Sequence, residues 1–165
     1  MKNITRKRKK KFKKSITEEI YLVTPTLHSS YQVELYFEEV DKKLITKGIS
    51  EEYYAWYLAT TYGKKADLIV DKMDFFIKGT PIENLIRAEL WYCIHHEMTN
   101  SLTDFFVRRT GRLYFNISSI TLYFDIILND FIKYLDWDDK RGQLETKKMN
   151  LLLADATTYY SEEFK

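Results

Sequence analysis

The sequence predicts an all-α fold, a compact bundle of about six to seven helices that follows a disordered basic N-terminal tail. Glycine and proline are scarce, at 5 and 2 of 165 residues, which argues against a turn-rich all-β chain. After residue 30, apolar residues recur at helical spacing, and no segment alternates convincingly with the period of two typical of a strand. The length is that of one domain, which buries roughly two-thirds of its unfolded surface.

Charge divides the chain into a tail and a body. Nine of the 26 bases lie in residues 2–14, which contain no acid, so repulsion and the lack of apolar surface predict disorder for residues 1–14. The other 17 bases are outnumbered by 24 acids, so the remainder carries a formal charge of −7. We expect residues 1–14 to be a tail or linker and residues 15–165 to form a single helical domain. An acidic body disfavours nucleic acid as its partner.

Several classes of protein are disfavoured by the composition. Cys93 is the single cysteine, so a disulfide framework is excluded and the cytoplasm is favoured. Its place on an apolar helix face predicts that Cys93 is a core residue. No run approaches the roughly 18 apolar residues of a membrane span, and no apolar stretch follows the basic start as in a signal peptide. The glycines are at least 15 residues apart, so no motif for a dinucleotide or phosphate is present and no cofactor-binding residue is assigned.

The first helix is predicted over residues 31–46. Ser29 and Gln32 have the spacing of a capping box, which contributes roughly 1 kcal/mol. Gly48 is expected to end this helix. Its apolar stripe consists of Val33, Phe37, Val40 and Leu44.

Two more helices are expected before residue 75. Ser50 is the predicted cap of the second helix, whose early acids suit a positive N-terminus. Gly63 fits the left-handed position at its end. The third helix is predicted over residues 64–73. The second helix is aromatic on more than one face, through Tyr54, Trp56, Tyr57 and Tyr62.

The clearest start signal opens the fourth helix. Thr80 is the cap, Pro81 takes the first helical position and Glu83 completes the capping box. The helix should run to about residue 98. Its broad apolar face consists of Ile82, Leu85, Ile86, Leu90, Cys93, Ile94 and Met98.

A short helix should follow, capped by Ser101 and Asp104 and ending near Arg109, with a break at Gly111. Residues 113–115 are expected to form an extended or looped apolar anchor.

The sixth helix is predicted to begin at Ser118 or Ser119 and to end at Tyr134. A last helix is capped by Asp136 and runs to about Tyr160. The expected buried side of the sixth helix consists of Leu122, Ile126, Ile127, Phe131 and Leu135.

Three carboxylates precede three guanidiniums in the middle of the chain. Asp104 and Arg108 are four residues apart on one helix and can pair directly. One interpretation is that an arginine binds an anionic substrate. The favoured interpretation is a structural network that ties helices together or to another domain, so no catalytic residue is assigned. The six residues are Glu89, Glu97, Asp104, Arg108, Arg109 and Arg112.

The paired histidines do not predict a metal site. His95, His96 and Glu97 lack the spacing that places two imidazoles on one helical face, because adjacent residues point about 100° apart. No metal ligand is therefore assigned. The 13 tyrosines, 10 phenylalanines and 3 tryptophans are expected to be core and interface residues.

Four pieces of the chain carry a resemblance to a known family: YYAWYLATTYGKKADLIV at 53–70, AELWY at 88–92, Glu97, and LTDFFVRRTGRLYF at 102–115. Together they span most of residues 50–160. They resemble the C-terminal helical domain of FAD-dependent, aerobic, quinone-linked glycerol-3-phosphate dehydrogenases and of alpha-glycerophosphate oxidases.

The resemblance implies a parent enzyme that oxidises glycerol 3-phosphate to dihydroxyacetone phosphate, with hydride transfer to FAD and electrons passing to quinone, or to oxygen in the oxidase. It implies that FAD is bound by the parent's other domain, on which this chain packs, and that the chain has no cofactor and is inert alone. A domain separated from its enzyme is expected, in the cytoplasm or at the cytoplasmic face of the membrane. Homo-oligomer and peripheral membrane contacts stay open.

A second hypothesis is a freestanding helical interaction module. Its acidic body would bind a protein, while the tail would bind RNA or anionic lipid. Dehydrogenase and oxidase are not distinguished by the sequence.

Overall fold

The computed structural model describes Ser15, Leu27 and residues 29–158. Within these residues every regular element is helical and no strand occurs, which confirms the all-α prediction. The tail at 1–14 and the predicted end of the last helix near residue 160 lie outside the described residues. The helices are α1 (Ser30–Thr46), α2 (Glu52–Tyr62), α3 (Ala66–Lys72), α4 (Pro81–Glu97), α5 (Arg112–Phe115), α6 (Ile117–Leu135) and α7 (Asp139–Thr157). Shorter elements are the 3₁₀ turns η2 (Gly63–Lys65) and η3 (Met73–Phe75) and the π-helical turn η4 (Asp104–Arg109).

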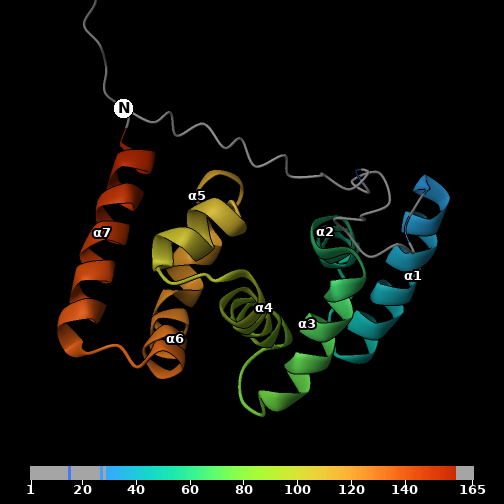
Figure 1. Ribbon diagram of the computed structural model, residues 1–165, viewed down its shortest axis with the longest axis horizontal. Coiled ribbons are helices and arrows are strands. Elements are labelled where there is room, and N and C mark those ends of the chain that lie inside the picture. Colours follow the sequence, from blue (N-terminus) through green and yellow to red (C-terminus); the bar gives the residue numbers. More distant parts are fainter. Residues whose placement is uncertain (1–14, 16–26, 28, 159–165) are drawn as a thin grey trace, which may run out of the picture.

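Helix α4 lies between two groups of helices (Figure 1). Helices α1, α2 and α3 are on one side, and α5, α6 and α7 are on the other. Contacts of α4 with α3 and with α6 connect the two groups. The buried core runs through both groups and α4. Its large, almost inaccessible side chains are Tyr36, Leu58, Ile69, Ile86, Leu90, Tyr92, Phe105, Phe106 and Phe131.

The two helix starts with the strongest local signals are confirmed. The Ser29 hydroxyl accepts a hydrogen bond from the Gln32 amide at 3.2 Å, and α1 begins at the next residue after Ser29. The Thr80 hydroxyl accepts from the Glu83 amide at 3.2 Å, with Pro81 in the first turn. A cap is decided by residues within one turn, so the sequence alone predicts it well.

The predictions for the next two helices need correction. Helix α2 starts at Glu52 after Glu51, so Ser50 is not its cap. Gly63 has a positive φ of 54°, but its ψ of −144° lies outside the left-handed helical region. The chain does not stop there, because Gly63 is the first residue of η2. The helix predicted over 64–73 is therefore shorter, and α3 is flanked by 3₁₀ turns. In α1, Tyr36 is buried, whereas two predicted stripe residues, Val33 and Phe37, are half-buried.

The prediction of an extended or looped anchor at 113–115 is wrong. These residues form the single helical turn α5, which follows the left-handed Gly111. Only Leu113 is buried, while Tyr114 and Phe115 are 70% and 85% exposed. One helical turn presents side chains in several directions, so a core on one side cannot take all three.

The ends of α6 also differ from prediction. The cap is Asn116, whose side chain accepts from the Ser119 amide at 3.3 Å, so α6 starts before Ser118. Asp136 ends α6 in a left-handed conformation, and Asp138 caps α7. Asp tolerates left-handed backbone, which is why it can end a helix as well as begin one. Leu122, predicted to be buried, is exposed.

Candidate interdomain site

The carboxylate of Glu89 is the centre of a buried polar cluster. Glu89 is 1% exposed on α4, and its Oε1 accepts hydrogen bonds from Tyr62 Oη at 2.8 Å and Tyr57 Oη at 2.5 Å. Its Oε2 accepts from Arg112 Nη2 at 2.7 Å. Arg112 also donates to Ser119 Oγ at 3.3 Å. The carboxylate therefore joins α2, α4 and α5, and Arg112 extends the cluster to α6.

The electrostatics of this cluster favour neutral donors around one ion pair. Burial, and then the charge of Glu89, raise the pKa of Tyr57 and of Tyr62, so both hydroxyls keep their protons. Burial alone would lower the pKa of Arg112, but Glu89 outweighs it and the pKa is raised. Burial raises the pKa of Cys93 to about 12. The Cys93 thiol is buried in the core, as predicted.

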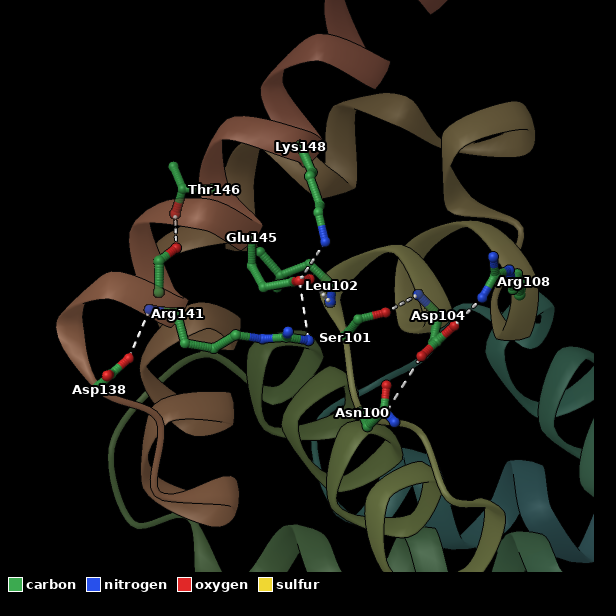
Figure 2. Close-up of polar contacts among 11 residues, drawn as sticks. Asn100, Ser101, Leu102, Asp104, Arg108, Asp138, Arg141, Glu145, Thr146 and Lys148 are labelled. Carbon is green, nitrogen blue, oxygen red and sulfur yellow. Dashed lines mark hydrogen bonds and ion pairs between the residues drawn. The ribbon is translucent and has the colours of Figure 1, made fainter.

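Two outer ion pairs follow on η4. Arg109 pairs with Glu97 and so joins η4 to the end of α4. Arg108 Nη1 lies 2.5 Å from Asp104 Oδ1, the pairing expected from their spacing (Figure 2). The Arg108 side chain is 72% exposed, so this pair adds little stability. The six charged residues singled out from the sequence thus form three separate pairs, and a role between domains stays a prediction.

The start of the η4 segment is fixed by local hydrogen bonds. Ser101 Oγ accepts from the Asp104 amide at 3.0 Å, and Asp104 Oδ2 accepts from the Asn100 amide at 3.4 Å (Figure 2). Burial alone would raise the pKa of Asp104, but its contacts with Ser101, Arg108 and Asn100 outweigh burial and lower it. Asp104 therefore remains charged and holds the chain that leads into η4.

A second buried carboxylate, Glu145 on α7, was not singled out from the sequence. It is 1% exposed, and its Oε2 accepts from the Leu102 amide at 3.2 Å (Figure 2). Its Oε1 lies 3.1 Å from Arg141 Nη2 and 3.3 Å from Lys148 Nζ. The bond to Leu102 attaches α7 to the segment that carries η4. The helical spacing to Arg141 and Lys148 was visible, but it is equally typical of a solvated helix face.

A third buried contact also escaped the sequence analysis. Arg87 on α4 donates to both oxygens of Asp130 on α6, at 2.7 and 2.9 Å. The Arg87 guanidinium also lies over the ring of Phe76, 4.3 Å from its centroid. This bidentate pair strengthens the junction between the two groups of helices.

An open hollow of about 730 Å³ lies between α2 and the segment from η4 to Asn116. Tyr57, a member of the buried cluster, is part of its lining, and so are Arg108 and Arg109. Four exposed aromatic side chains surround it, and we call them the aromatic face: Tyr53, Trp56, Tyr114 and Phe115.

The histidines take part in ring contacts. His95 stacks on Trp91 with its Nδ1 2.8 Å from the Trp91 carbonyl oxygen, and His96 stacks on Tyr92. Over Ser15, Leu27 and 29–158, no group of three or more His, Cys, Asp or Glu is placed to hold a metal ion. No helix in the same residues has the length and apolar character needed to cross a membrane.

Comparisons with known proteins agree on one family. Residues 16–142 match the model of the C-terminal domain of alpha-glycerophosphate oxidase. The chain is 36% identical over 118 residues to the aerobic glycerol-3-phosphate dehydrogenase of Bacillus subtilis, covering 70% of this chain and 21% of that protein. It is 33% identical over 104 residues to the Staphylococcus haemolyticus enzyme of the same name, covering 61% of this chain and 18% of that protein.

A solved structure shows the same fold. The glycerol-3-phosphate dehydrogenase of Bacillus halodurans, complexed with FAD, superposes with a TM-score of 0.66 at 22% identity. The superposition covers 80% of this chain and 28% of that chain. This chain spans about a fifth of the length of the curated relatives it matches.

Proposed function

Because this chain belongs to the family of the C-terminal domain of alpha-glycerophosphate oxidase, we propose that it is the C-terminal helical domain of an FAD-dependent glycerol-3-phosphate dehydrogenase. The parent reaction would convert glycerol 3-phosphate to dihydroxyacetone phosphate, with hydride transfer to FAD and electrons passing to quinone. This chain would pack on the flavin-binding domain and would be inert alone. The observation that carries the proposal is the match over residues 16–142 to the C-terminal domain.

The geometry supports a packing role more than a catalytic one. The guanidinium of Arg112 is buried against Glu89 and is not available to a phosphate in solution. Arg109 and Arg108 are also paired, with Glu97 and Asp104. Side chains that an enzyme would use on an anionic substrate are here engaged with one another, as in a structural element.

The test has two steps. The purified chain should show no flavin absorbance and no oxidation of glycerol 3-phosphate with a dye acceptor. The corresponding C-terminal region of the Bacillus subtilis relative would then be replaced by residues 15–165 of this chain. We expect this chimera to retain flavin and oxidise glycerol 3-phosphate, and the relative without any C-terminal region to lose most of both. A chimera without flavin or turnover would contradict the proposal.

The same proposal includes a location. With its parent enzyme the chain would lie in the cytoplasm, and contact with the cytoplasmic face of the membrane or with a second copy would be made by the assembled enzyme. The family resemblance supports these points, and the single cysteine of the chain also favours the cytoplasm.

A further inference from the structure

The aromatic face is a concentration of large exposed apolar groups. Tyr53 and Trp56 come from α2, and their ring centroids are 6.5 Å apart. Tyr114 and Phe115 come from α5, also with centroids 6.5 Å apart. Aromatic side chains gathered at one surface are typical of a protein contact, because they bury much area at little entropic cost.

The hollow inside the aromatic face is lined by basic side chains, whose acidic partners Asp104 and Glu97 lie outside the lining. Its lining includes two guanidiniums, those of Arg108 and Arg109, and no acidic residue among those that the structure describes. Arg108 is the more exposed of the two. Since arginine suits bidentate contact with carboxylates, a matching partner offers carboxylates beside apolar side chains.

Both walls of the hollow are fixed to the buried cluster. The α2 wall is held by Tyr57, which lines the hollow and donates to Glu89. The other wall is held by Arg112, which begins α5 and binds the same carboxylate. Gly111 allows Phe115 to lie close, since a Cβ there would be 3.1 Å from its ring. A surface that is rigid before binding loses less entropy on docking.

We propose that the aromatic face is the surface on which the flavin-binding part of the enzyme docks, through carboxylates that meet Arg108 and apolar groups that enter the hollow. The inference rests on the proposed function. This chain spans 21% and 18% of the length of two relatives, so their much larger remainder is available to cover an exposed apolar face of this domain. Another apolar groove, between α6 and α7, takes several lining residues from beyond residue 142, outside the family match. The aromatic face lies wholly within the match.

The test is hydroxyl-radical footprinting of the isolated full chain and of the chimera with the Bacillus subtilis relative. Side-chain oxidation at Trp56, Tyr114 and Phe115 should fall severalfold in the chimera. Phe75 and Ile77 are also exposed, but they line a different hollow, so their oxidation should stay unchanged.

Matched variants of the chimera sharpen the test. Trp56→Ser combined with Phe115→Ser should lower flavin retention severalfold, and so should Arg108→Glu. Phe75→Ser with Ile77→Ser, and Lys133→Glu as the charge control, should have little effect. Circular dichroism of each isolated chain checks that it is folded, since all substituted residues are exposed.

The outcomes separate two failures. An active, flavin-bearing chimera with unprotected aromatic residues would overturn the docking face and leave the proposed function intact. A chimera without flavin or activity would overturn both. Protection of the aromatic face from oxidation in the isolated chain would also overturn the inference. Protection that rises with protein concentration would show that a second copy covers the face. Protection that appears on addition of glycerol 3-phosphate would show that the hollow binds a small ligand.

Discussion

Two carboxylates, Glu89 and Glu145, are equally buried, but their partners differ in exposure and in their place in the fold. The partners of Glu89 are two tyrosine hydroxyls and a guanidinium that is itself buried. The cations beside Glu145, Arg141 and Lys148, are on the same helix and are 40% and 51% exposed. Only its bond to the Leu102 amide reaches another part of the fold.

The difference shows that burial of a charge does not by itself indicate how much of the fold depends on it. Every partner of Glu89 comes from a distant segment, so loss of one partner affects the packing of several helices. At Glu145 the cations are in contact with water, which screens their charge and can replace it. We therefore expect the first site to be sensitive to substitution and the second to be tolerant, except at the backbone bond.

The largest expected effect is at the buried guanidinium. Arg112→Met removes the counter-charge of Glu89 and should lower the free energy of unfolding by about 3–5 kcal/mol. The matched control, Arg141→Met beside Glu145, should cost no more than about 1 kcal/mol. Urea unfolding followed by circular dichroism measures both. Equal losses at the two sites would remove the distinction between them.

The next effect concerns the tyrosine donors. Tyr62→Phe keeps the ring but removes the hydrogen bond to Glu89, and should cost about 1.5–3 kcal/mol, the range for a bond to a charged group. Tyr53→Phe is the control, because its ring is exposed on the same helix. Urea unfolding measures this effect too. If Tyr62→Phe is as stable as the unsubstituted chain, the hydrogen bond from Tyr62 to Glu89 contributes nothing to stability.

A smaller effect is expected where Glu145 binds backbone. Glu145→Ala leaves the buried Leu102 amide without an acceptor and should cost about 1–3 kcal/mol, whereas Glu145→Gln keeps an acceptor and should cost less. Amide hydrogen exchange over residues 100–104 should accelerate in the alanine variant only. If the glutamine variant exchanges just as fast, the charge and not the hydrogen bond holds this segment.

The smallest effect for a single substitution is a change in the dependence of stability on alkaline pH, to which the buried groups around Glu89 contribute. Folding raises the pKa of Cys93 from 9.0 to about 12, and it also raises those of Tyr57 and Tyr62. The unfolded chain therefore loses these protons first, so stability is full below pH 9 and falls as pH rises towards 12. The slope should not exceed about 1.4 kcal/mol per pH unit for each group. The free energy of unfolding is measured by urea titration at several pH values from 8 to 10.5. Its fall with pH should be shallower for Cys93→Ala, and an unchanged fall would contradict the raised pKa of Cys93.

The sequence predicted what is decided locally. The Thr80 cap with Pro81, and the Asp104–Arg108 pair, depend on residues within about one turn, and both are present. That Glu89 pairs with Arg112, 23 residues away, could not be predicted, because three arginines were available and tertiary packing selects among them. Tyr57 and Tyr62 were expected to be core or interface residues. Their hydrogen bonds to Glu89 could not be predicted, because the spacing of rings on a helix does not show where the hydroxyls lie.

The remaining errors come from competing local solutions. Asp136 and Asp138 are both good helix caps, and only the packed structure shows that the first ends α6 and the second starts α7. Glu145 has the pattern of a solvated helix charge, because the amide of Leu102 that buries it is brought there by the fold. Residues 104–109 carry no sequence sign of a π-helix.

That π-helical turn has a consequence for how the family can vary. In η4 the Thr110 amide donates to the Phe105 carbonyl oxygen, five residues back, at 3.0 Å. An α-helix closes the same contact with four residues, so the turn holds one residue more than an α-helical path would need. Deletion of one residue here should leave both flanking segments in place but turn Arg109 by about 100° away from Glu97. Relatives with a shorter segment should therefore carry a different partner for Glu97.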